Sequence, residues 1–276
     1  MTTRTSRWWT FAGLIIVVYS FFPLAWMISL AFKPPAEIVS GHASFLPRNW
    51  TLDNFTEVFS TSLFTRALIN SIGIALIATG LSVVVAMFAA YAIARLEFRG
   101  KKVLLSLALG IAMFPQASLV GPLFNMWRGF GIFDTWVGLI IPYVTFALPL
   151  SIWTMSAFFR QIPWEMEHAA QVDGATAWES FRKVIVPLAA PGVFTTAILT
   201  FFFCWNDFLF SMSLTSTDSA RTAPAALAFF QGASYFESSV PYVMAASVII
   251  TIPVIILVLA FQRKIVAGLT SGAVKG

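Results

Sequence analysis

The chain has 276 residues, of which 58% are hydrophobic and only 11% are charged. Soluble proteins carry about 25% charged residues, so this composition excludes an ordinary soluble domain and indicates an integral membrane protein. The formal net charge is +5 at pH 7. Nucleic-acid binding would need those charges in a solvent-facing cluster, whereas most of them follow the membrane topology, so no nucleic-acid partner is expected.

Six apolar stretches are long enough to be transmembrane helices, which need about 20 residues to cross roughly 30 Å of hydrocarbon. They cover residues 8–32, 67–96, 103–124, 137–159, 192–214 and 243–261. A closed barrel would show segments of about 10 residues with alternating polarity, and these runs are too uniformly apolar for that. The sequence therefore predicts an all-α polytopic membrane protein with six transmembrane helices, in a single domain of residues 1–276.

The lysines and arginines predict the orientation, because cytoplasmic loops retain positive charge during insertion. If both termini are cytoplasmic, twelve of the 17 lysines and arginines lie on the cytoplasmic side of the membrane and five lie on the opposite side. The five are Lys33, Arg48, Arg66, Arg128 and Arg221. We therefore expect a multi-pass protein in contact with the lipid bilayer, with both termini in the cytoplasm.

Residues 161–187 are the one long polar interruption in the apolar second half of the chain. Pro163 suits the first turn of a helix, and Glu165 and Glu167 place negative charge at its positive end. This helix is expected to run to about Val172. Because its surroundings are membrane, the segment is expected to contact something in water.

A bend and a second short helix are expected to follow. Asp173 and Gly174 should end the first helix, since glycine tolerates the left-handed conformation that closes helices. Thr176 and Glu179 have the spacing of a capping box, which begins another helix. Pro187 should stop that second helix. The expected product is a stiff cytoplasmic projection, and the plainer alternative is an ordinary loop with helical turns.

The residue order in this segment resembles the coupling motif of ABC importer permeases, and it is carried by Glu165, Glu167, Ala169, Ala170, Asp173, Gly174, Ala175, Ile185 and Pro187. In that family the first short helix docks in a cleft of the ATPase subunit. The resemblance thus implies an ATPase-coupling role for Glu165, Glu167, His168, Ala169, Ala170, Asp173 and Gly174. His168 departs from the family, which usually has glutamate immediately before the paired alanines.

The resemblance covers nearly the whole chain. Within this family, the chain is similar to the sugar-importing branch, specifically to the second permease subunit of maltose-type systems. It is carried by residues 50–59, Asn70 with Ser71, and residues 89–95, 122–125, 135–142 and 268–276. The blocks RKVIVPLAAPG and QRKIVAGLTSGAVKG are similar to trehalose importers of mycobacterial type. The resemblance implies a type I ABC importer permease fold, a bacterial cell membrane, trehalose as the substrate, and a cytoplasmic C-terminal tail at residues 262–276 that reaches toward the ATPase.

The same resemblance implies three kinds of protein partner: a homologous second permease, cytoplasmic ABC ATPase subunits and an extracytoplasmic sugar-binding lipoprotein. The chain itself has no glycine-rich loop ending in Gly-Lys-Ser or Gly-Lys-Thr that could hold phosphates. We therefore expect no cofactor and no enzymatic activity in this chain, with ATP and Mg bound by the ATPase partners.

Polar side chains within the fifth apolar stretch predict a sugar pathway, because polar groups in a bilayer usually face the bundle interior or water. Thr196, Thr200, Phe203, Asp207 and Ser211 have helical spacing along one face. The expected lining is Phe203, Trp205, Asn206 and Asp207, with Gln116 and Asn70 as weaker candidates. The alternative for Asp207 is a hydrogen bond that packs helices, and the partner permease could supply most of the sugar contacts.

Other functional classes fit less well. An ion-coupled secondary transporter would usually show several intramembrane ionisable residues, and only Asp207 stands well inside a span. A membrane enzyme or metal site would need clustered ligands, but the two histidines lie on opposite sides of the membrane and the single cysteine, Cys204, is isolated. A permease for another oligosaccharide or sugar derivative remains the main alternative to trehalose.

Overall fold

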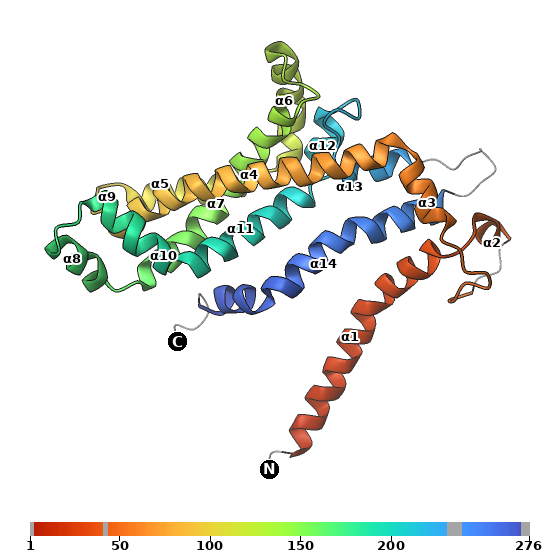
Figure 1. Ribbon diagram of the computed structural model, residues 1–276, viewed down its shortest axis with the longest axis horizontal. Coiled ribbons are helices and arrows are strands. Elements are labelled where there is room, and N and C mark those ends of the chain that lie inside the picture. The colour runs from red at the N-terminus through yellow and green to blue at the C-terminus, as the bar shows by residue number, and fades with distance from the viewer. Residues whose placement is uncertain (1–2, 41–43, 231–238, 272–276) are drawn as a thin grey trace. The chain divides into compact units, whose positions relative to one another are not determined.

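The computed structural model describes residues 3–40, 44–230 and 239–271, and within these ranges it contains helices and no strand (Figure 1). The predicted all-α class is therefore confirmed. The elements are α1 (Thr3–Ala31), α2 (Pro35–Val39), α3 (Asp53–Ser60), α4 (Ser62–Arg95), α5 (Lys101–Ala112), α6 (Gln116–Phe130), α7 (Trp136–Gln161), α8 (Trp164–Val172), α9 (Ala177–Ser180), the π-helix η1 (Phe181–Ile185), α10 (Val186–Leu188), α11 (Ala190–Trp205), α12 (Leu209–Leu214), α13 (Ala223–Ala226), the 3-10 helix η2 (Leu227–Phe229) and α14 (Val240–Ser271).

Four helical segments are each long and apolar enough to cross a membrane, namely Trp8–Ala31, Ser62–Arg95, Trp136–Gln161 and Val240–Gln262. Two bent pairs also qualify: Lys101–Ala112 with Gln116–Phe130, bent by 86°, and Ala177–Leu188 with Ala190–Trp205, bent by 71°. Counting each pair as one span gives the predicted six among the described residues.

The third predicted span, 103–124, is not one continuous helix. α5 ends at Ala112 and α6 begins at Gln116, with Pro115 between them in an extended conformation. Proline has no N–H to continue the helical ladder, and it disfavours the helical conformation in the preceding residue, Phe114. The chain therefore turns at this point instead of passing straight through the span.

The chain divides into two compact units, residues 1–65 with 226–253 and residues 66–225 with 254–276. In the first unit, the Asn54 side chain of α3 is fully buried. Its amide nitrogen donates hydrogen bonds of 2.8 Å to the carbonyl oxygens of Ala31 and Lys33. These carbonyls lie at the end of α1, where no helical partner remains, so Asn54 satisfies them and fixes α3 to that end.

In the second unit, α7 packs against both α5 and α11. Gly192 of α11 permits a close approach, because a Cβ atom there would lie 2.3 Å from Cγ of Phe158 on α7. Pro142 interrupts the hydrogen-bond ladder of α7 and leaves the carbonyl of Gly138 without its usual donor. The Trp127 indole N–H of α6 donates to that carbonyl at 2.7 Å, so the interruption is repaired by a neighbouring helix.

α8 and α9 lie beyond one end of α4 and α7, whereas α12 lies toward the other end of the second unit (Figure 1). The last helix, α14, continues beyond the predicted sixth span through residue Ser271. Most of the predicted C-terminal tail, residues 262–271, is therefore helical. The remainder, residues 272–276, lies outside the described residues.

Candidate functional site

The first helix of the polar segment forms as its sequence predicts. α8 spans Trp164–Val172, and Glu165 and Glu167 occupy its first turn. After the helix ends, Gly174 adopts a φ of +88°, the left-handed conformation expected of a helix-ending glycine. The Gly174 N–H donates to the carbonyl of Gln171 at 3.0 Å, which closes the end of α8.

The predicted capping box begins the second helix. The Glu179 N–H donates to the Thr176 hydroxyl at 3.2 Å, and the Thr176 N–H donates to the Glu179 carboxylate at 3.0 Å. Lys183 adds a salt bridge of 2.9 Å to the same carboxylate, one turn further on. The capping box and its following turn are confirmed.

Pro187 does not stop this second helix, contrary to the sequence prediction. After α9 the backbone widens into the π-helix η1, in which the Val186 N–H bonds to the carbonyl of Phe181, five residues back. α10 then carries the helix through Pro187 to Leu188. The wider turn accommodates a proline that lacks an N–H, so the bend falls at Ala189 and not at Pro187.

Glu167 is buried at 5% exposure and does not lie on the outer surface of α8. Its Oε1 accepts a hydrogen bond of 2.5 Å from the Tyr91 hydroxyl of α4. Its Oε2 lies 3.7 Å from Nε of Arg95, close enough for a strong ion pair but too far for a hydrogen bond. Tyr91 and Arg95 are four residues apart on α4, so Glu167 fastens α8 to one face of that helix.

Arg95 joins the same helix to the beginning of the polar segment. It is 5% exposed, its Nη2 donates to the carbonyl of Ile162 at 2.6 Å, and its guanidinium lies 4.5 Å from the ring centre of Trp164. A cation over an indole face is attracted by the ring quadrupole. The sequence signals Arg95 only as a charge at the end of an apolar span, and its partners lie 67 to 72 residues further along the chain.

Aromatic and aliphatic side chains extend this attachment through η1. Phe181 and Ile185 are buried in a cluster with side chains of α4 and α7, among them Phe159 and Met155. The rings of Phe181 and Tyr91 lie 4.7 Å apart in an edge-on arrangement. The polar segment is therefore attached to the membrane helices at two places, Glu167 and η1, and it is not an ordinary loop.

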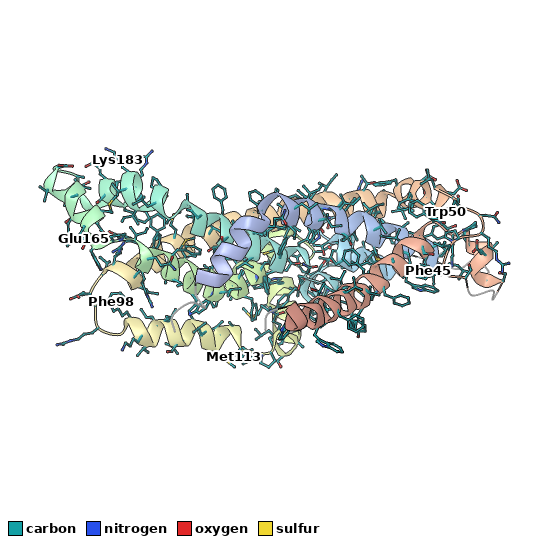
Figure 2. The ribbon with its side chains drawn as sticks, turned by 90° about the horizontal axis from the view of Figure 1, so that it is seen from below. Phe45, Trp50, Phe98, Met113, Glu165 and Lys183 are labelled. Carbon is teal, nitrogen blue, oxygen red and sulfur yellow. The ribbon has the colours of Figure 1, made fainter. Side chains whose placement is uncertain are left out.

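Most of the predicted coupling residues face outward, on either side of the buried Glu167. Glu165, His168, Ala169, Asp173 and Gly174 are exposed, and Ala170 is half-buried. Val172, at 86% exposure, adds an unshielded apolar side chain. Figure 2 shows Glu165 and Lys183 at the end of the molecule that carries α8 and α9. Six of the seven predicted coupling residues therefore lie on an accessible surface, and Glu167 lies beneath it.

Asp207 does not continue a helical face, contrary to the predicted stripe through the fifth span. α11 ends at Trp205, and α12 begins at Leu209. The Asp207 carboxylate accepts hydrogen bonds from the Ser211 N–H at 3.0 Å and from the Tyr143 hydroxyl at 2.7 Å. It therefore caps the start of α12 and links it to α7, because the first N–H groups of a helix have no helical partner.

The neighbours of Asp207 face in different directions. Trp205 is 1% exposed and stacks on Phe201 with ring centres 5.5 Å apart, and its Nε1 has no hydrogen-bond partner among the described residues. Asn206 is exposed and donates to the carbonyl of Phe202 at 2.8 Å, while Phe203 is half-buried. The predicted pathway residues therefore differ in exposure: Trp205 is buried, Phe203 and Asp207 are half-buried, and Asn206 is exposed.

Asn70 is buried and its hydrogen bonds are internal. Its amide nitrogen donates to the carbonyls of Asp218 and Arg221, each at 3.0 Å, and its oxygen accepts from the Trp136 indole at 3.0 Å. Asn70 thus holds the loop before α13 against α4 and α7. Gln116, the other weaker candidate, is half-buried at the first position of α6.

Asp134 holds the other side of that loop and was not signalled by the sequence. It has a φ of +59°, and its carboxylate accepts hydrogen bonds from the backbone of Ser216 at 3.0 Å and from the Thr217 hydroxyl at 2.5 Å. Burial raises the pKa of Asp134, but the hydrogen bonds from Thr217 and Ser216 outweigh it and hold the pKa below its usual value.

Among the described residues, no group of three or more His, Cys, Asp or Glu side chains could hold a metal ion. The polar side chains instead serve as caps, loop clamps and anchors between helices. These contacts attach helices to one another at both the α8 end and the Asp207 end.

Comparison with known proteins gives a consistent result. Residues 82–271 match the family described as binding-protein-dependent transport system inner membrane component. The chain is 55% identical over 276 residues, the full length of both proteins, to the trehalose transport system permease protein SugB of Mycobacterium tuberculosis. It is 40% identical to the trehalose/maltose transport system permease protein MalG of Thermococcus litoralis, covering 96% of this chain and 95% of that protein.

Solved structures agree on the fold. A chain from a bacterial ABC transporter involved in the import of the acidic polysaccharide alginate matches with a TM-score of 0.78 at 22% identity, covering 95% of this chain and 98% of that one. A chain of the MetNI methionine ABC transporter matches with a TM-score of 0.60, covering 75% of this chain and 96% of that one. The fold is that of type I ABC importer permeases, and the protein belongs to the binding-protein-dependent transport system inner membrane component family of multi-pass membrane permeases.

Proposed function

We propose that this permease belongs to an ABC importer whose substrate is the disaccharide trehalose. The observation that carries the proposal is the 55% identity, over the full length of both chains, to a trehalose transport system permease. The 40% identity to a trehalose/maltose permease supports the same substrate class. The chain forms half of the translocation pathway and transmits the effect of ATP hydrolysis to it.

The proposed assembly has four kinds of component. This chain pairs with a homologous second permease, cytoplasmic ABC ATPase subunits bind ATP and Mg, and an extracytoplasmic lipoprotein delivers the sugar. The distribution of lysine and arginine supports an orientation with both termini in the cytoplasm. The absence of a phosphate-binding loop from the sequence supports a role without ATPase activity of its own.

In this proposal the exposed surface of α8 docks in a cleft of the ATPase subunit. The small side chains of Ala169 and Ala170 permit close approach, and exposed Val172 supplies an apolar contact. His168 stands where the family usually has glutamate, so its contact with the ATPase differs from that of a carboxylate. Glu167 acts beneath this surface, because its bonds to Tyr91 and Arg95 connect a docked α8 to α4.

The proposed sugar pathway includes the region around Asp207. Exposed Asn206 and half-buried Phe203 supply a hydrogen-bonding group and an aromatic face, the combination that binds sugars. Trp205 can join them only in another conformation, and its buried indole N–H, which has no partner in the part of the chain that the structure describes, supports such a rearrangement. Asn70 and Gln116 are the weaker contributors, and the partner permease contributes the remainder of the pathway.

A second sugar is a specific alternative, because the chain is also 37% identical to the sulfoquinovosyl glycerol transport system permease SmoH of Agrobacterium fabrum. The test is to reconstitute this chain with its second permease, ATPase and binding lipoprotein in liposomes. Trehalose should stimulate ATP hydrolysis and its own uptake, whereas maltose and sulfoquinovosyl glycerol serve as controls. Stimulation by another sugar alone would refute trehalose, and failure to assemble with any ATPase would refute the coupling role.

A further inference from the structure

A basic cavity lies at the end of the second unit that carries α8, and neither the coupling role nor the sugar pathway uses it. It has a volume of about 400 Å³. Three of its six lining residues are cationic and three are apolar: Lys101, Lys102, Arg160, Ile93, Ala94 and Leu105. The lining comes from three helices, α4, α5 and α7, so the cavity is built by the fold and not by one charged run.

Among the described residues, the three cations have no ion-pair partner. The ion pairs of the described residues join Arg95 to Glu167, Lys183 to Glu179 and Arg221 to Asp218, and none of them involves the cations of this cavity. Lys101 is half-buried, whereas Lys102 and Arg160 are exposed. Glu97, the nearest carboxylate in the sequence, is exposed and does not line the cavity.

The helix ends add to the positive potential. Lys101 and Lys102 are the first two residues of α5, which has no acidic side chain in its first turn. The N-terminus of a helix carries partial positive charge, so two lysines at this position repel it. An anion bound here would relieve the repulsion between the three side chains and between them and the helix.

The position in the membrane indicates which anion is available. Two candidate spans end beside the cavity, at Arg95 and Gln161, and the bent third span begins there at Lys101. The cavity therefore lies where hydrocarbon gives way to headgroups. Its cations match a phosphate, and its apolar residues, Ile93, Ala94 and Leu105, match the start of an acyl chain. We propose that this cavity binds the phosphate headgroup of an anionic phospholipid, in the leaflet on the α8 side.

The test measures binding of fluorescent phosphatidylglycerol to the purified transporter in neutral detergent, with phosphatidylcholine of the same chain length as the neutral control. Wild type should prefer phosphatidylglycerol. Because each cation near a membrane surface contributes about fivefold to binding of anionic lipid, K101Q/K102Q/R160Q should weaken phosphatidylglycerol binding by about a hundredfold. R160Q alone, which leaves α5 unchanged, should weaken it by about fivefold.

A matched control removes three charges outside the cavity, as R48Q/R66Q/R99Q. It should bind phosphatidylglycerol like wild type. Equal loss in both triple variants would refute the site, since the effect would then depend on net charge. Displacement of the lipid by millimolar inorganic phosphate would refute the lipid assignment and identify a soluble anion. Unchanged lipid binding with loss of the ATPase from K101Q/K102Q/R160Q would identify the cavity as a protein contact, and would also refute the proposal.

Discussion

The buried attachment of α8 makes a quantitative prediction for Glu167→Ala. The side chains of Arg95 and Glu167 are only 2% and 6% exposed, so removing the carboxylate leaves a cation buried without its counter-charge. Breaking a buried pair in this way costs about 3 to 5 kcal/mol. We expect the lower end, about 3 kcal/mol, because Arg95 keeps its hydrogen bond to Ile162 and its contact with Trp164.

Hydrogen exchange of the α8 backbone amides measures this loss of free energy directly in the helix that Glu167 attaches. Loosening the attachment by about 3 kcal/mol should raise the exchange rate of α8 amides roughly a hundredfold, since each tenfold corresponds to about 1.4 kcal/mol. Amides of α11, which does not contact Glu167, should be unaffected. Glu167→Gln should lie between wild type and Glu167→Ala, because its amide oxygen can still accept the Tyr91 hydroxyl bond.

Glu165→Ala is the matched control, because it removes an exposed carboxylate from the same turn of the same helix. It loses only a favourable interaction with the helix N-terminus, worth at most about 1 kcal/mol, so exchange should rise by less than about fivefold. Equal exchange in the two alanine variants would refute the reasoning that Glu167 anchors α8. In the assembled transporter, Glu167→Ala should also reduce trehalose uptake per ATP hydrolysed more than Glu165→Ala does.

Three further predictions follow from local geometry. Gly174→Ala forces a side chain into a φ of +88°, at a cost of about 1 to 2 kcal/mol, and should lower uptake per ATP, whereas Gly121→Ala, in open space on α6, should not. Asp207→Ala should reduce uptake, because it removes the cap of α12. Asp207→Asn keeps an oxygen acceptor and should retain most of the wild-type uptake. Equal uptake by the two variants would contradict this. Because the pKa of Asp134 is lowered in the folded protein, wild type should melt above Asp134→Asn at pH 6. This difference should begin to shrink as the pH falls below about 4, the usual pKa of the carboxyl, and should disappear only below the lowered pKa of the folded protein. A constant difference in melting temperature would contradict this.

The sequence predicted those parts of the fold that depend on local signals. The capping box at Thr176, the turn at Gly174 and the start of α8 after Pro163 all require only neighbouring residues. The apolar stretches likewise indicated the spans. Breaks within a stretch were harder to place, because the chain is apolar on both sides of Pro115.

The site was less predictable, because its contacts join distant parts of the sequence. From the sequence of α8 alone, Glu167 is expected to be an exposed docking residue. Its contacts with Tyr91 and Arg95 of α4 bury it instead. Asp207 looked like a lining residue in a continuous helix, but the chain breaks after Trp205 and turns the carboxylate into a cap. Neither outcome can be obtained from spacing alone, because Glu167 is covered by α4 and because Asp207 is linked to Tyr143 of α7 after α11 has ended.

The two attachments of the polar segment also determine what a spectroscopic probe there would measure. Val172 lies between Glu167 and η1, is 86% exposed and lies outside the buried cluster around η1, so a label at this position leaves both anchors in place while reporting from the proposed docking surface. Because Glu167 and Phe181 both contact Tyr91 on α4, displacement of the label must be accompanied by movement of the last turns of that helix. Distances measured from residue 172 during turnover would therefore follow the transmembrane helix itself, from a position outside the membrane.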